Sequence, residues 1–149
     1  MEDLDRMTIR PLKPGDYSQL ISLWARCGLP SRPHGRDSKE HIRTELSRET
    51  SSFLVAFDRA NDLIGSVFAT HDGRKGWINR LAVDPRWRRQ GVAQALILEA
   101  ETRLHESGIE IIGCLIEDGN VASEALFGAV GYVRHNDIHY YTKRSRPDI

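Results

Sequence analysis

The order of apolar patterns along the chain most constrains its fold. Runs of β-prone residues alternate with segments in which apolar residues recur at helical spacing, and turn residues such as Gly and Pro separate them. The predicted order is β-α-α-β-β-β-α-β-α-β-β. This order indicates a mixed sheet with helices on its faces, and therefore an α/β or α+β fold class.

Seven segments are predicted to be strands. The segment 109–116 is nearly all apolar, which predicts a buried central strand. The last two strands are expected to form a hairpin about Asn136-Asp137. The predicted strands are residues 8–12, 52–58, 63–71, 77–83, 109–116, 132–134 and 138–143.

Four segments are predicted to be helices. The first covers residues 15–27, and the second opens at Asp37, because Glu40 follows it at the spacing of a capping box. A long amphipathic helix begins at Val92 and ends before Gly108. The fourth helix is predicted over residues 120–130.

Length and charge narrow the possible functions. A chain of 149 residues predicts one domain over residues 1–149, with 1–7 as an N-terminal extension. Because 21 basic and 21 acidic residues balance, we expect no nucleic-acid partner. No apolar run is long enough for a membrane span, and two cysteines indicate neither a disulfide scaffold nor a metal site. A cytoplasmic protein is the expectation.

The segment 81–93 carries the most chemical information. It predicts a strand that passes through a tight turn into the N-terminus of a helix, where unpaired N–H groups and the helix dipole attract anions. Gly91 lets a ligand approach the backbone closely. Arg86, Arg88 and Arg89 add positive charge, which suits a pyrophosphate. A surface turn with solvated arginines is the plain alternative, and neither a Walker loop nor a Rossmann fingerprint is present.

Several motifs together resemble those of the GNAT acetyltransferase superfamily. Residues 88–93 are similar to its Gln/Arg-x-x-Gly-x-Gly/Ala motif, and residues 81–85 look like the strand before it. Glu117 to Asn120, Phe127 and Gly131-Tyr132 resemble the family's later pattern. The opening Ile9-Arg10-Pro11 is also similar, so the resemblance runs from about Thr8 to Lys143.

The resemblance implies transfer of an acetyl group from acetyl-CoA to an amine. It also implies that two central strands, residues 77–83 and 109–116, splay apart so that pantetheine can insert between them. The local charge suits such a cofactor, because six basic residues and one acid lie within residues 74–94. The implied cofactor-binding residues are Leu81, Ala82, Val83, Arg88, Arg89, Gln90, Gly91, Val92, Ala93, Gln94, Asn120 and Phe127.

Three residues are the candidates for catalysis. The resemblance implies that the backbone N–H of Val83 stabilises the oxyanion. Asn79 stands where the family often has a Glu or His base, and it could position a water but has little basicity. Asn120 is expected near the cofactor arm, or alternatively as a helix N-cap. Phe127 replaces the Tyr that usually protonates the thiolate. Strand periodicity predicts residues 77, 79, 81 and 83 on one face.

The acceptor amine is the least defined part of the sequence-based prediction. Trp24, His34 and Trp77 are the candidate acceptor-binding residues, although Trp24 also has core spacing. The loop 31–37 contains Arg32, His34 and Arg36, and could admit a carboxylate-bearing amine or an acidic peptide. It could equally be a solvated loop. Other histidines and nearby polar residues are predicted to be structural or on the surface.

Two other functions compete with an acetyltransferase. Phe127 and the missing strand base also fit an acyl-CoA-binding module with little or no catalysis. A plain interaction domain whose basic turn binds nucleic acid is the third possibility. A monomer or a homodimer is expected, with no membrane partner and no metal.

Overall fold

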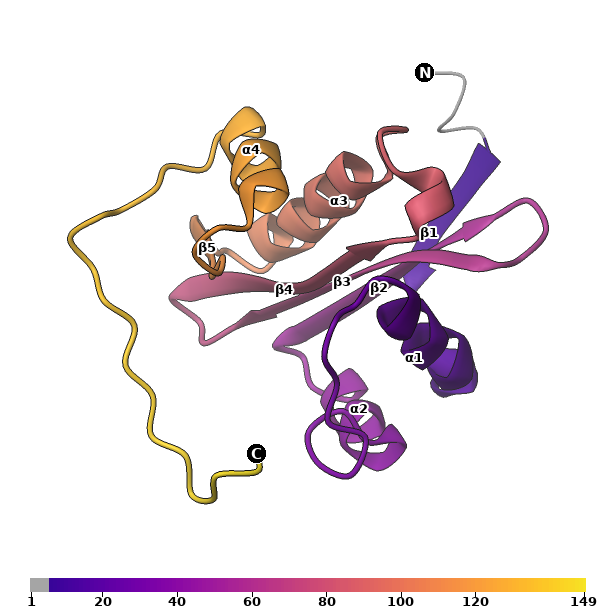
Figure 1. Cartoon of the computed structure of the whole chain (residues 1–149), viewed down its shortest axis with the longest axis horizontal. Coiled ribbons are helices and arrows are strands. Elements are labelled where there is room, and N and C mark those ends of the chain that lie inside the picture. The colour runs from indigo at the N-terminus through magenta and orange to yellow at the C-terminus, as the bar shows by residue number, and fades with distance from the viewer. Residues whose placement is uncertain (1–5) are drawn as a thin grey trace.

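The computed structural model describes residues 6–149, and its centre is one five-stranded sheet (Figure 1). The strands lie in chain order, and neighbours are antiparallel except for the parallel pair formed by the last two. This mixed sheet confirms the predicted fold class. The strands are β1 (Met7–Pro11), β2 (Ser51–Asp58), β3 (Leu63–His71), β4 (Lys75–Val83) and β5 (Ile111–Cys114).

Four α-helices cover the two faces of the sheet. Figure 1 shows α1 (Tyr17–Arg26) and α2 (Lys39–Leu46) on one face, and α3 (Val92–Glu106) and α4 (Val121–Ala129) on the other. Short 3-10 turns, η2 (Pro14–Asp16) and η3 (Pro85–Trp87), precede α1 and follow β4. The sheet therefore separates the molecule into an α1/α2 side and an α3/α4 side.

Each side has its own hydrophobic core. On the α3/α4 side, α3 residues such as Leu96 and Ile97 pack fully buried against alternate residues of β2 and β3. On the α1/α2 side, Leu20, Leu23 and Trp24 of α1 pack against the other alternate set. Because both faces of β2 and β3 are covered, these two strands are buried almost throughout.

A bulge in β4 interrupts the alternation of its side chains. Ser66 pairs with Ala82 but Phe68 pairs with Asn79, so β4 carries one extra residue there, and Arg80 has a φ of 53°. Residues before and after the bulge consequently change faces. The prediction that 77, 79, 81 and 83 share one face is therefore wrong.

The end of the chain differs from the prediction. β5 has four residues and lies at the edge of the sheet, with Ile111 60% exposed, whereas the sequence predicted a long central strand. The predicted hairpin is absent from the described residues, and residues 133–148 are exposed. The apolar run 109–116 predicted a buried strand. The segment that was expected to cover it is exposed instead, including Val133, Ile138 and Tyr140. Without strands from this segment, β5 has no outer neighbour.

Two predicted boundaries also move. The N-cap of α2 is Ser38, whose hydroxyl accepts the His41 N–H. Asp37 is buried, and its carboxylate accepts a hydrogen bond from Arg80 instead. β1 begins at Met7, so the predicted extension over 1–7 is too long by at least that residue. Residues 1–5 lie outside the described part of the chain.

Candidate active site

The second half of β4 has an open edge. Pairing between β4 and β5 ends at Ile78 and Cys114, but β4 continues to Val83. The Asp84 N–H donates to the Ile64 carbonyl on β3, at 2.8 Å. Because successive residues of a strand direct their polar groups to opposite sides, the Val83 N–H and carbonyl face the open edge. An extended ligand could therefore take the place of a strand here.

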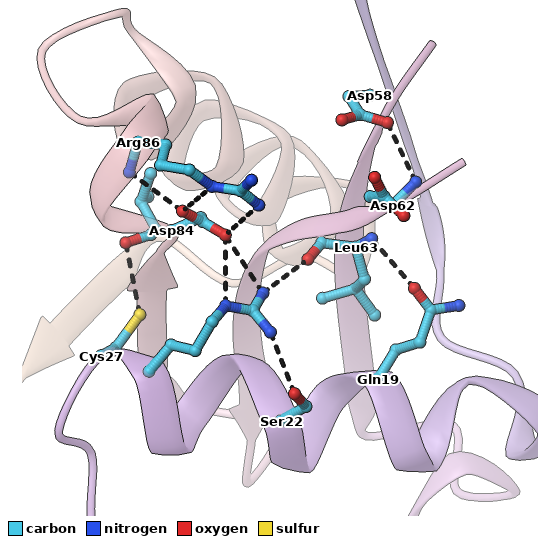
Figure 2. A network of polar contacts seen from close by, with 10 residues as sticks. Gln19, Ser22, Cys27, Asp58, Asp62, Leu63, Asp84 and Arg86 are labelled. Carbon is cyan, nitrogen blue, oxygen red and sulfur yellow. Dashed lines mark hydrogen bonds and ion pairs between the residues drawn. The ribbon is translucent and has the colours of Figure 1, made fainter. Parts of the chain in front are cut away.

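A buried carboxylate fixes the end of this edge (Figure 2). The Asp84 side chain is 1% exposed and accepts the Arg86 backbone N–H at 2.9 Å and its guanidinium at 3.2 Å. Arg26 of α1 donates to the same carboxylate at 3.2 Å. The hydrogen bond from Arg86 lowers the pKa of Asp84, although burial opposes this effect. Asp84 thus ties β4 to α1 and to the following turn.

A thiol occupies the carbonyl beside this anchor. Cys27 lies just after α1, and its Sγ donates to the Val83 carbonyl at 3.3 Å (Figure 2). Burial raises the pKa of Cys27, so the sulfur keeps the proton that it donates. The Val83 carbonyl is therefore partnered from α1, while its N–H faces the open edge.

The N-terminus of α3 forms an anion-binding turn. Its N-cap is Gly91, with a φ of 84°, and this residue has no side chain to cap the helix. The first helical bond runs from the Ala95 N–H to the Gly91 carbonyl, so the N–H groups of residues 92–94 have no partner within the helix. Arg89 also has a positive φ, of 60°, so the backbone turns sharply just before the helix. Arg88 and Arg89 are exposed beside it. These features fit a pyrophosphate.

The predicted strand residues fall on different sides. Leu81 and Val83 pack against the α3/α4 core, whereas Ala82 is buried in the α1/α2 core. Asn79 pairs with Phe68 and is exposed on the α1/α2 side. Trp77 is half-buried, and its ring lies over Gly113 of β5. The Trp77 and Asn79 side chains and the Val83 backbone thus lie on one strand, and the bulge separates the two side chains from Val83.

Two predicted ligand-binding residues belong to the core instead. Trp24 is 0% exposed, and its Nε1 donates to the Ser66 hydroxyl at 3.0 Å. It therefore cannot wall an acceptor pocket in this conformation. Phe127 is 6% exposed and meets the ring of Tyr132 edge-on, with centroids 5.0 Å apart. It packs in the α3/α4 core, because α4 turns its largest apolar side chain inward.

Asn120 and His34 occupy loop positions. The Asn120 carbonyl oxygen accepts the Ser123 N–H at 3.2 Å, which confirms the helix-capping alternative for this residue. Its proximity to a cofactor stays a prediction. His34 is exposed in the loop between α1 and α2.

The sequence patterns did not predict an ion pair that holds the loop between α1 and α2 to β4. Arg80, at the bulge, places Nη2 2.8 Å from the Asp37 carboxylate and donates through Nη1 to the Pro30 carbonyl. Its guanidinium also lies 4.6 Å from the centroid of the Trp24 ring. In the sequence, Arg80 was marked only as a charged residue in the middle of the predicted strand 77–83, whose other residues are apolar except for Asn79.

The described residues also bear on metal binding and on membrane insertion. Among residues 6–149, no cluster of three or more His, Cys, Asp or Glu side chains has the geometry to hold a metal ion. No helix in the same range combines the length and apolarity needed to cross a bilayer.

Comparison with known proteins identifies the family. Residues 17–132 match the acetyltransferase (GNAT) family. The chain belongs to this family. A GNAT relative, Acetyltransferase SG1711 of Sodalis glossinidius, is 31% identical over 138 residues, which cover 93% of this chain and 95% of the relative. The family and enzyme class expected from the sequence motifs are thus confirmed.

Solved structures share the GNAT fold. The aminoglycoside 6'-N-acetyltransferase AAC(6')-Ih from Acinetobacter baumannii has a TM-score of 0.77 at 18% identity, covering 93% of this chain and 98% of its own. The PaiA N-acetyltransferase from Thermoplasma acidophilum, solved with coenzyme A, has a TM-score of 0.73 at 23% identity, with 84% and 88% covered. At these identities the likeness establishes the architecture of the sheet and helices.

Proposed function

We propose that this GNAT protein transfers the acetyl group of acetyl-CoA to a primary amine by direct attack. The observation that carries the proposal is the open edge of β4 from Asn79 to Val83, beyond the last pair with β5. The uncapped N-terminus of α3 follows on the same chain segment. An extended pantetheine arm and a pyrophosphate need these two features, in this order.

Backbone groups would hold the co-substrate. The N–H groups of residues 92–94 and the exposed Arg88 and Arg89 would bind the pyrophosphate. Along the open edge, Leu81 and Val83 would bind the pantetheine as a neighbouring strand would. The bound co-substrate supplies an activated thioester carbonyl.

The Val83 N–H would stabilise the negative charge that develops on the carbonyl oxygen. As the amine nitrogen bonds to the carbonyl carbon, the C–S bond breaks and the thiolate leaves. A thiol with a pKa of about 8.5 is a good leaving group, so water can supply its proton. Phe127 is buried and has no hydroxyl to donate. Asn79, exposed on the α1/α2 side, would orient a water that removes the amine proton.

An acyl-CoA-binding module without catalysis is the second candidate. It is favoured by one observation: neither Phe127 nor Asn79 can serve as an acid or base of useful strength. Tight binding of acetyl-CoA with no release of thiol above the hydrolysis rate, across a broad panel of amines, would support it.

Two glycines at opposite ends of α3 provide a matched test. Gly91 and Gly108 have φ values of 84° and 82°, and an added Cβ would meet no atom within 4 Å at either position. Gly91→Ala and Gly108→Ala should therefore destabilise folding equally, by about 1 kcal/mol. Only Gly91 lies at the proposed pyrophosphate site.

We expect Gly91→Ala to raise the KM for acetyl-CoA about tenfold, because the methyl group would hinder the close approach of a phosphate to the backbone. This factor is the equivalent of one charge-assisted hydrogen bond, and Gly108→Ala should leave the KM unchanged. Isothermal titration with CoA and a thiol-release assay would measure this. Equal effects of the two substitutions, or no binding of CoA by the wild type, would contradict the proposal.

The proposal also covers the cellular location and the partners of the protein. The proposal places the protein in the cytoplasm, because Cys27 and Cys114 are both free thiols. It includes no nucleic-acid partner, given the balanced charge. A monomer or homodimer is expected, and sedimentation would distinguish them.

A further inference from the structure

The loop between α1 and α2 lies beside the bulge of β4. Arg80 donates to the Pro30 carbonyl at one end of the loop and to the Asp37 carboxylate at the other. Asp37 in turn accepts the Arg32 N–H at 2.7 Å. Arg80 immediately precedes Leu81 on the open edge, so the loop is held close to the proposed thioester site.

The sheet determines from which side an acceptor can approach. The proposed pyrophosphate site is on α3, on the α3/α4 side. An amine that attacks a thioester held at the open edge of β4 would then come from the α1/α2 side, because the co-substrate occupies the other approach. The loop at 30–37 lies on this α1/α2 side.

A cavity of about 920 Å³ opens between this loop and the end of the chain. Its walls are residues 31–36, His41, Tyr140 and the segment 142–149 except Pro147. Figure 1 shows the C-terminal segment leaving α4 and ending on the side of α2. The cavity is large enough for a small amine or the end of a peptide.

The cavity walls are strongly basic. Five lysine and arginine side chains line the cavity against a single aspartate, Asp148. Asp148 is 3.5 Å from Arg146, and Arg144 donates to the Ile149 carbonyl. Within the described part of the chain, the other three cationic side chains have no carboxylate partner; they are Arg32, Arg36 and Lys143.

Positive charge also accumulates where the cavity meets the bulge. Burial lowers the pKa of Arg80, and Arg36 lowers it further through like-charge repulsion, while Asp37 opposes both. An anion bound near Arg36 would relieve this repulsion. A polycationic acceptor would increase it.

We propose that the acceptor amine carries an anionic group, a carboxylate or a phosphate, which Arg32, Arg36 and Lys143 bind in this cavity. This inference rests on the proposed acetyltransferase function and specifies its substrate class. Guanidinium groups bind either anion through paired hydrogen bonds, and the anion orients the amine toward β4. His34, also in the cavity wall, was predicted to bind the acceptor and has the same role here.

Matched acceptors test the inference. Each pair shares one amine and differs in charge: β-alanine against β-alaninamide, and phosphoethanolamine against ethanolamine, with spermidine as a polycation. The expected result is a kcat/KM at least about tenfold higher for the anionic member of one pair, since one charge-assisted bond contributes about that factor. The pair that responds identifies carboxylate or phosphate as the anion.

A charge reversal provides the control within the protein. Compared with the wild type, Arg36→Glu should lower kcat/KM for the preferred anionic acceptor about tenfold and leave the KM for acetyl-CoA unchanged. Arg43→Glu makes the same change of net charge on exposed α2, away from the cavity, and should have little effect. Saturation-transfer NMR of the same acceptors with the CoA complex gives a second readout that needs no turnover.

The outcomes separate the two proposals. If CoA binds and neutral acceptors are acetylated at least as well as their anionic partners, the anionic-acceptor inference is overturned and the acetyltransferase proposal stands. Preference for spermidine overturns it as well. Failure of the wild type to bind CoA would instead refute the function on which it rests.

Discussion

Removing Arg80 should reveal a strongly coupled ion pair. The side chain of its partner Asp37 is 7% exposed and that of Arg80 is 16% exposed. If one of the two charges is removed, little water can therefore solvate the other. Burial is the largest influence on the Arg80 pKa and lowers it despite Asp37. In a buried pair of this kind the desolvation cost largely cancels the attraction, so we expect the pair to contribute more to position than to stability.

The magnitudes follow from this cancellation. Arg80→Ala and Asp37→Ala should each destabilise the fold by about 3 kcal/mol, because each leaves one charge buried without its partner. The double variant should lose no more than about 3 kcal/mol rather than about 6, since it leaves neither charge buried without a partner. Arg80→Gly should be about 1 kcal/mol more stable than Arg80→Ala, because the φ of 53° no longer strains a side-chain-bearing residue.

Urea unfolding followed by tryptophan fluorescence measures these values, and Trp24 is a convenient probe because Arg80 lies over its ring. The coupling energy comes from the double-mutant cycle. If the two single losses add to within about 0.5 kcal/mol, the two charges do not depend on each other and the reasoning is refuted.

Three further substitutions test other parts of the structure. Ser66→Ala removes the partner of both the Trp24 Nε1 and the Arg80 carbonyl and should cost about 2 kcal/mol by urea unfolding, whereas exposed Ser18→Ala should cost almost nothing. The Asp84 pKa is lowered by folding, so its contribution is full above the unfolded pKa and lost as pH falls through the folded one. The stability gap between wild type and Asp84→Asn should accordingly be constant above about pH 5 and shrink below about pH 4. Phe127→Tyr should destabilise by about 1–3 kcal/mol, because it buries a hydroxyl, without raising kcat; a large gain in kcat would show that position 127 reaches the thiolate.

Local patterns predicted most of the helices and strands. β2, β3 and α3 form close to the predicted residues, because alternation and helical periodicity reflect the face that each element buries. The turn at Gly91 was predicted for a similar reason: its chemistry lies within a few consecutive residues. The sequence misled where the partner of an apolar segment was assumed, as it was for β5 and the hairpin after Gly131.

Contacts between distant residues account for what could not be predicted. The bulge depends on Ser66, whose hydroxyl joins Trp24 to the Arg80 carbonyl across 42 and 14 positions of the sequence. The ion pair with Asp37 spans 43 positions. A positive φ at an arginine has no local signature, since glycine or asparagine normally marks such a position.

The bulge links the two halves of the proposed site. Without the extra residue, strand alternation would put Asn79, Leu81 and Val83 on one face, and the side chains of Leu81 and Val83 would leave the α3/α4 core that they now cover. With it, Arg80 reaches the loop on the α1/α2 side while the next residues present their backbone along the open edge. One residue thus sets both the position of the proposed acceptor loop and the course of the strand that would bind the thioester. A substitution at Arg80 should therefore affect acceptor binding before it affects acetyl-CoA binding, because the loop depends on its side chain and the strand only on its backbone.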